Sequence, residues 1–353
     1  MQGSVFSIKK SILAKCKGFS SFTLMKRSRL APQAYADGIL AGDRLMLSRA
    51  ITLAESTRAD DAELAGQVVD LVLPATGKSL RVGITGVPGV GKSSFLEAFG
   101  TYLTEEENQN IAVLAIDPSS RRSSGSILGD KTRMEKLSRN PKAYIRPSPA
   151  GSALGGTAAR TRETMLLCEA AGYQTVFIET VGVGQSETSV RNMVDFFLLL
   201  MLAGAGDELQ GIKRGIMEMA DGLAITKADG ENIKYAKKAQ AEYAAALHLF
   251  PPATSQWIPE VKSCSAYEGT GLAEIWQMIM AYHQKTLANG YLTRLRQQQE
   301  LSWFEDTVNH LLKNHFYQNT KVLEALPSIK KSVIQRETSA VAAARQLFSI
   351  YAD

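Results

Sequence analysis

The sequence predicts an α/β fold in which a mostly parallel sheet is covered by helices on both faces. Short apolar runs, each of the length of a buried strand, recur at residues 80–85, 111–116, 175–179, 195–202, 222–226 and 261–265. Helical stretches separate most of these runs, which is the order that builds a parallel sheet. A glycine-rich motif directly follows the first run, and such sheets bind ligands at the carboxyl ends of their strands.

Composition excludes several classes of protein. The chain has 353 residues and a formal net charge of +5, which is too mild to indicate a nucleic-acid partner. Its three cysteines (Cys16, Cys168 and Cys264) are far apart and odd in number, which argues against a disulfide framework or a clustered cysteine metal site. The longest apolar run, residues 196–203, is too short to span a bilayer. We therefore expect neither nucleic-acid binding nor a membrane span.

The N-terminal segment differs from the rest of the chain. Residues 1–34 are rich in Lys, Arg and Ser, and no acidic residue precedes Asp37. We expect a basic, disordered tail in a cytoplasmic protein. The alternative is a targeting segment, since transit peptides are basic and poor in acid, and it would send the protein to the mitochondrial matrix.

Residues 35–78 predict a helical segment with two amphipathic helices. Asp43 can cap the first, and Leu47, Ile51 and Ala54 then share one face. Asp60 with Glu63 resembles a capping box for the second helix. The apolar face of that helix would consist of Leu64, Val68, Leu71 and Val72.

Two larger segments complete the division of the chain. Residues 79–284 hold the predicted strands and every motif described below. Residues 285–353 have a helical pattern, with an apolar face formed by Trp303, Phe304, Val308, Leu311, Leu312 and Phe316. That face could contact another molecule or the protein's own domain.

The glycine-rich motif is a phosphate-binding loop. Residues 86–93 fit G-x-x-x-x-G-K-[ST] in full, with a strand before them and a helix after them. Backbone N–H groups and the helix N-terminus would hold the phosphates, while Lys92 reaches the β- and γ-phosphates and Ser93 binds Mg²⁺. The predicted contact residues are Gly86, Val87, Pro88, Gly89, Val90, Gly91, Lys92, Ser93 and Ser94. The motif predicts a P-loop nucleotide hydrolase.

A second motif selects the base. Thr226-Lys227-Ala-Asp229 follows a late strand, and a fixed carboxylate there can accept from guanine N1–H and the N2 amino group. Adenine has no donors along that edge, so a buried acid would penalise it. The Lys227 stem can pack over the purine. Backbone N–H groups of Ser265, Ala266 and Tyr267 can meet guanine O6. These residues favour GTP, with GDP as the product.

Acidic residues near the predicted phosphates supply metal ligands. Glu179 ends an apolar strand and is followed by Gly182, whose N–H can sense the γ-phosphate. Asp117 ends the preceding strand, and Asp130 lies in a Ser/Gly-rich stretch. Mg²⁺ usually takes one or two carboxylates, so some of these acids could order loops or water instead, and Asp130 could be a simple turn residue.

The group that positions the hydrolytic water has no standard motif in this sequence. No glutamine directly follows Gly182, and the nearest is Gln185. We therefore expect slow intrinsic hydrolysis that a partner accelerates. The catalytic candidates from the residues alone are Lys92, Asp117, Glu179 and Gln185.

Longer runs resemble one family. The matching stretches are residues 86–93, 117–120, 125–134, 179–187, 204–213 and 226–229, and the similarity extends from about Ala36 to the C-terminus. The sequence resembles the MeaB/ArgK family of GTPases. This resemblance implies a SIMIBI-type P-loop fold and a G-protein chaperone of an adenosylcobalamin-dependent acyl-CoA mutase, chiefly methylmalonyl-CoA mutase, which gates cofactor loading and protects the mutase.

The resemblance also assigns roles to two regions. It implies that residues 202–213 form a third switch loop that communicates with the mutase, with Asp207, Glu208, Gln210 and Lys213 as coupling candidates and Lys213 added to the catalytic set. It further implies a homodimer formed through the C-terminal helices. The basic N-terminal stretch extends beyond the usual bacterial start of the family.

Alternative functions make different demands on the residues. A metal-insertion GTPase of the nickel-chaperone type needs Cys or His ligands near the nucleotide, but the histidines (His248, His283, His310 and His315) are late and scattered. A protein kinase linked to amino-acid transport needs an acceptor site that no motif supplies. A binding module without turnover fits poorly with intact Lys92, Ser93 and Glu179.

Overall fold

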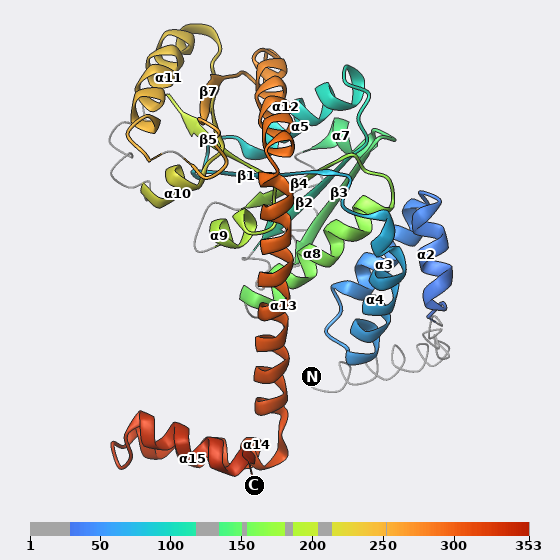
Figure 1. Ribbon diagram of the computed structural model, residues 1–353, viewed down its shortest axis with the longest axis vertical. Helices are drawn as coiled ribbons and strands as arrows, with labels where there is room; N and C mark the ends of the chain where they lie inside the picture. Colours follow the sequence, from blue (N-terminus) through green and yellow to red (C-terminus); the bar gives the residue numbers. More distant parts are fainter. Residues whose placement is uncertain are drawn as a thin grey trace, which may run out of the picture.

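The computed structural model describes residues 29–117, 134–149, 154–180, 186–203, 214–251 and 253–352. Its centre is a seven-stranded parallel sheet in the order β3-β2-β4-β1-β5-β6-β7 (Figure 1). The strands are β1 (Leu80–Gly86), β2 (Ile111–Asp117), β3 (Ala143–Pro149), β4 (Thr175–Thr180), β5 (Phe196–Leu202), β6 (Gly222–Thr226) and β7 (Glu260–Ser263). The predicted α/β class is therefore confirmed.

Among the strands of the described residues, β3 is the one that the sequence analysis did not predict. It lies at the edge of the sheet and pairs only with β2. Its sequence carries Pro147 and Pro149, which break the apolar pattern and which a sheet tolerates at an edge. The N-terminal helices cover this edge, since Arg44 donates to Ala143 O at 2.7 Å and the Ser48 and Tyr144 hydroxyls lie 3.1 Å apart.

Helices cover both faces of the sheet. One face is packed by α8 (Leu154–Ala170), α9 (Ser186–Arg191), α10 (Arg214–Met219) and α11 (Ile233–Leu247), and the other by α5 (Lys92–Glu105), α7 (Glu135–Arg139) and α12 (Leu272–Ala288). Alternate residues of β5 show this arrangement, because Leu198 and Leu200 face α5 and α12 while Leu199 and Met201 face α10 and α11. The protein is thus a three-layer α/β structure.

Within residues 29–79, three helices and not two precede the sheet: α2 (Pro32–Leu40), α3 (Arg44–Ala54) and α4 (Ala59–Val72). The predicted cap of α3 is confirmed, since Asp43 accepts from Leu45 N at 2.7 Å and Met46 N at 3.2 Å. A short 3-10 turn, η1 (Leu73–Ala75), follows α4 and leads to β1. These helices pack on α8 and share its hydrophobic core.

The predicted capping box of α4 is wrong. Arg58 is the N-cap residue and no side chain caps the helix, so Asp60 lies within the first turn. The neighbouring Asp61 instead accepts from Arg29 (2.8 and 2.7 Å) and Ser56 (2.7 Å), which tethers the start of α4. The predicted apolar face is also rotated, because Leu71 is 41% exposed. The buried apolar residues of α4 are Ala65, Val68, Val69 and Val72.

The C-terminal helices form an arm. Helix α13 (Tyr291–Gln318) begins after a turn at Gly290 and extends away from the sheet, and α14 (Thr320–Ile334) and α15 (Ala340–Ala352) lie at its far end (Figure 1). Residue 284, the expected end of the GTPase domain, lies inside α12. The two terminal helices have a small core of their own, formed by Val322, Ile329, Ala343 and Leu347.

Polar side chains anchor the first turns of α13 to the sheet. Arg296 donates to both carboxylate oxygens of Asp195 (2.8 and 2.7 Å) and to the carbonyls of Ser79 and Gly77. Gln299 donates to Val194 O at 2.8 Å, and Trp303 packs against the core. The apolar face expected on this helix is therefore divided. Trp303 points inward, while Phe304, Val308, Leu311 and Leu312 are exposed.

Among the described residues, no helix combines the length and apolar character needed to cross a membrane.

Candidate nucleotide site

The phosphate-binding motif forms the loop between β1 and α5. Gly89 and Gly91 have φ angles of 79° and 91°, a region that favours glycine, and Gly91 is the N-cap residue of α5. A Cβ atom at Gly86 would lie 2.6 Å from Leu200 O, so only glycine fits beside β5. Val90 is fully buried and fixes the loop to the core, whereas Pro88, Gly89 and Ser94 are exposed. The loop has the shape of an anion cradle at a helix N-terminus.

Lys92 lies across the same loop. Its Nζ donates to Gly86 O at 2.9 Å and to Val87 O at 3.4 Å. Burial lowers the pKa of Lys92, and the carboxylates of Glu179 and Glu187 oppose that shift. A half-buried ammonium group at this position provides the positive charge that a triphosphate requires.

A hydroxyl and a carboxylate meet beside Lys92. Ser93 Oγ lies 3.5 Å from Glu179 Oε1, and β1 and β4 are in register with Ile84 opposite Glu179. Below them, Thr180 Oγ1 donates to Thr85 Oγ1 at 2.9 Å in the buried interior. Serine and carboxylate oxygens are hard ligands that suit Mg²⁺, so this pair fits the predicted ion.

The other predicted metal, sensor and catalytic residues lie wholly or in part outside the described part of the chain. Asp117 is the last residue of β2, next to β4 in the sheet, but its side chain lies outside the described part of the chain. The remaining residues of the predicted site, Asp130, Gly182, Gln185 and Lys213, also lie outside the described ranges, as do the coupling candidates Asp207, Glu208 and Gln210.

The turn after β6 is tied to the phosphate loop. Thr226 Oγ1 donates to Val90 O at 2.8 Å and to Met201 O at 3.3 Å. Lys227 Nζ donates to Gly89 O at 3.0 Å, which lays the aliphatic stem beside Gly91. The Thr-Lys-Ala-Asp motif and the P-loop, which are more than 130 residues apart, thus form one surface.

The acid of this motif is held by a serine from the last strand connection. Ser265 Oγ lies 2.6 Å from Asp229 Oδ2 and accepts from Glu268 N at 3.0 Å, so its proton is donated to Asp229. Ala266 follows within the same turn. Tyr267 is 93% exposed, so its side chain does not pack in this turn, and its backbone N–H remains the group predicted to meet guanine O6. These two hydrogen bonds hold the Asp229 carboxylate in one orientation.

The comparisons with known proteins agree with this geometry. Residues 47–321 match a protein-family profile described as methylmalonyl Co-A mutase-associated GTPase MeaB. The chain belongs to the MeaB family of GTPases. The MeaB family resemblance proposed from the sequence is thereby confirmed, and with it the P-loop fold and the assignment as a GTP hydrolase that binds GTP.

Relatives in this family come from bacteria and from animal mitochondria. The chain is 48% identical to the GTPase ArgK of Escherichia coli over 302 residues, 84% of this chain and 91% of the relative. It is 44% identical to the mitochondrial methylmalonic aciduria type A homolog of Mus musculus over 336 residues, 92% of this chain and 80% of the relative. A crystal structure titled LAO/AO transport system kinase matches with a TM-score of 0.72 at 37% identity, over 92% of this chain and all of that one.

The structure adds residues that the MeaB motifs alone did not identify. Asn232 donates to Lys227 O at 2.6 Å and supports a residue whose φ is 57°. Thr85 and Thr180 join the strands that carry the P-loop and Glu179. Asn232 lies three residues after Asp229, where a polar side chain near a turn was a usable signal. The threonine pair gave none, because it joins strands distant in sequence.

Proposed function

We propose that this protein is a Mg²⁺-dependent GTPase that acts as the G-protein chaperone of an adenosylcobalamin-dependent acyl-CoA mutase, with methylmalonyl-CoA mutase as the client. The observation that carries the proposal is the family match over residues 47–321, since that family is named for its association with the mutase. The relatives named for methylmalonic aciduria type A support the same client. In this role the protein gates cofactor loading and protects the mutase.

The hydrolytic chemistry follows from the site residues. The triphosphate of GTP would lie on the loop of residues 86–94, with Lys92 against the β- and γ-phosphates and the guanine against Asp229. Ser93 and Glu179 would hold Mg²⁺, with Asp117 and Asp130 as further candidates; the ion neutralises developing charge on the phosphate oxygens. Gln185 is the candidate that orients the attacking water, and Gly182 N–H the γ-phosphate sensor.

Three segments would report the nucleotide state. Residues 117–130 and 179–187 are ordered by the γ-phosphate and released after hydrolysis. Residues 202–213 would relay the change to the mutase through Asp207, Glu208, Gln210 and Lys213.

The protein acts as a homodimer in this proposal. The supporting feature is the exposed apolar stripe on α13, where Phe304 is 66% and Leu311 61% exposed, since a monomer rarely leaves such a row uncovered. Its bacterial relatives suggest the cytoplasm, and its mitochondrial relatives suggest the matrix if residues 1–34 act as a transit peptide.

The decisive experiment measures GTP hydrolysis with and without the mutase of the same organism. We expect slow basal hydrolysis that rises at least tenfold with mutase. Glu208→Ala should keep the basal rate within about threefold and lose most of the stimulation, whereas Glu242→Ala, an exposed glutamate on α11, should behave as wild type. A rate that does not respond to mutase would overturn the chaperone assignment and leave the GTPase intact.

A further inference from the structure

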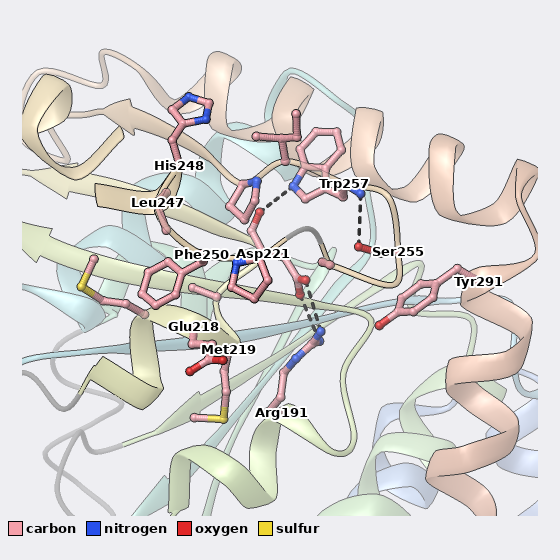
Figure 2. A pocket seen from close by; sticks show the side chains of 16 residues that line it. Arg191, Glu218, Met219, Asp221, Leu247, His248, Phe250, Ser255, Trp257 and Tyr291 are labelled. Atoms are coloured by element: carbon pink, nitrogen blue, oxygen red, sulfur yellow. Dashed lines mark hydrogen bonds and ion pairs between the residues drawn. The ribbon is translucent and has the colours of Figure 1, made fainter. Parts of the chain in front are cut away.

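A cavity lies at the amino ends of the strands, away from the nucleotide site at their carboxyl ends. It has a volume of about 470 Å³, which is in the range of small-molecule sites. Figure 2 shows Arg191 and Asp221 together in its interior, with Trp257, Phe250 and Tyr291 around them. Asp221 precedes β6 and Arg191 ends α9, so the cavity is at the amino ends of the strands.

The floor of the cavity is an ion pair between Arg191 and Asp221 that further hydrogen bonds hold in place. Arg191 Nη1 lies 3.0 Å from Asp221 Oδ2, and Nη2 donates to Oδ1 at 3.2 Å. The same carboxylate accepts from Phe197 N at 2.9 Å, and Trp257 Nε1 donates to Asp221 O at 2.7 Å. Both charged side chains are largely buried, so the floor offers a donor and an acceptor side by side with no net charge.

The walls determine what could occupy this cavity. They are mostly apolar and aromatic, with Met217, Met219, Leu247, Phe250, Trp257 and Ile258 among the lining residues. The lining above the floor also includes the polar residues Glu218, His248 and Ser255. An added charge would disturb a partly desolvated ion pair, whereas a group with an adjacent acceptor and donor can meet both partners. A compact apolar molecule that ends in a carboxamide-type group has this chemistry.

The cavity contacts three elements that matter to the proposed function. Arg191 ends α9, a helix of six residues and roughly 9 Å that begins at Ser186, within the proposed switch 179–187. Met217, Glu218 and Met219 belong to α10, which begins directly after the proposed switch 202–213. Tyr291 is the first residue of the arm helix α13. An occupant would therefore touch elements adjoining both switches and the arm.

The far end of α9 reaches the phosphate site. Glu187, in its first turn, is buried and acts electrostatically on Lys92. In the arrangement described here the Lys92 ammonium is hydrogen-bonded to the carbonyls of Gly86 and Val87. A ligand that binds most tightly to this arrangement of α9 would stabilise it, because a ligand favours the state to which it binds more tightly. Such a ligand would then disfavour the state in which Lys92 contacts phosphate.

We propose that this cavity is a regulatory site for a small neutral molecule with an apolar body and a carboxamide-type end, and that its occupation weakens GTP binding. The proposal rests on the switch roles given under the proposed function. Its test uses basal GTP hydrolysis, so it does not depend on the mutase.

Three probes share a ring and differ only in the charge of the end group: benzamide, benzoate and benzamidine. Binding is followed by ¹³C-methyl methionine NMR, in which the Met217 and Met219 signals report on the cavity. We expect benzamide to shift these signals with a Kd on the order of a millimolar, as suits so small a ligand. At saturation it should raise the KM for GTP at least twofold.

A pair of variants provides the control. Ala253→Trp places a large side chain in the cavity from its exposed rim and should abolish both effects, while Ala245→Trp, on an exposed position of α11 outside the cavity, should keep both. Absent methyl shifts, or shifts that persist in Ala253→Trp, would overturn the site. Tighter binding of benzoate or benzamidine would overturn the neutral ligand class, and binding without a change in KM would overturn the regulatory role.

Discussion

Replacement of Asp229 by Asn tests the predicted base site most directly. Ser265 accepts from Glu268 N and donates to Asp229 Oδ2 at 2.6 Å, so the serine requires an acceptor on its side. In Asp229→Asn the amide oxygen must therefore stay with Ser265. The amide NH₂ then turns toward the base, where guanine presents N1–H and the N2 amino group. The carboxylate accepts from both guanine groups, whereas the amide NH₂ of the variant is itself a donor and cannot accept from either.

The size of this effect can be worked from the contacts. Each hydrogen bond from guanine to a charged acceptor contributes about 1.5–3 kcal/mol. Loss of both should weaken GTP binding by at least about 3 kcal/mol, which is roughly a hundredfold in Kd. Xanthine carries a carbonyl oxygen in place of the N2 amino group, so the turned amide can donate to it. We expect the variant to bind XTP more tightly than GTP.

The assay is competition of GTP and XTP against a fluorescent GDP analogue, with thermal unfolding as a check on the fold. The double variant Asp229→Asn with Ser265→Ala releases the amide to rotate, and should lose the preference for XTP. A GTP affinity within threefold of the wild type in Asp229→Asn would remove Asp229 from the site. Weaker GTP binding without a gain for XTP would refute the orienting role of Ser265.

Three further predictions concern the scaffold. Glu169→Gln leaves the buried Arg81 guanidinium without its carboxylate (2.6 Å in the wild type), and should lower the free energy of unfolding in urea by about 3 kcal/mol; a loss below 1 kcal/mol would contradict this. Burial raises the pKa of Glu163 to about 7, so the folded state binds this proton more tightly than the unfolded state. Wild-type stability should therefore fall as pH rises from about 4.5 to 7, and Glu163→Gln should flatten that fall, which unfolding at a series of pH values measures. Phe304→Glu with Leu311→Glu places charges on the exposed stripe of α13 and should convert a dimer to a monomer in light scattering, while an unchanged mass would exclude this stripe as the interface.

Sequence patterns predicted those parts of the fold that local periodicity determines. The six apolar runs became strands because buried parallel strands are apolar throughout, and Asp43 became a cap because a cap depends only on its neighbours. The sequence analysis missed strand β3 because prolines argue against a strand unless it lies at the edge of a sheet. The position of a strand in the sheet follows from the whole fold and not from the local sequence. Likewise, the long-range tether at the start of α4 is made by Asp61, not Asp60, because Asp61 accepts from Arg29 of another segment.

In the nucleotide site, too, the sequence predicted local features but not contacts between distant segments. The motifs indicated which residues meet the nucleotide, because their spacing reflects chemistry shared by many such proteins. They did not indicate how the residues hold one another. The contacts of Thr226 with Val90 and of Lys227 with Gly89 join segments distant in sequence, and such contacts follow only once the strand order places β6 near β1.

The Arg296 anchor has a consequence for biosynthesis. It joins residues 217 and 219 positions apart, from the start of the arm back to the segment that enters β1. Until residue 296 has left the ribosome, the Asp195 carboxylate, which is fully buried in the finished protein, has no guanidinium to neutralise it. The nucleotide-binding core of a nascent chain is therefore completed only when the arm is made. A chain that ends after α12 would carry every GTP motif but would leave the buried Asp195 unpaired, and its core would be less stable.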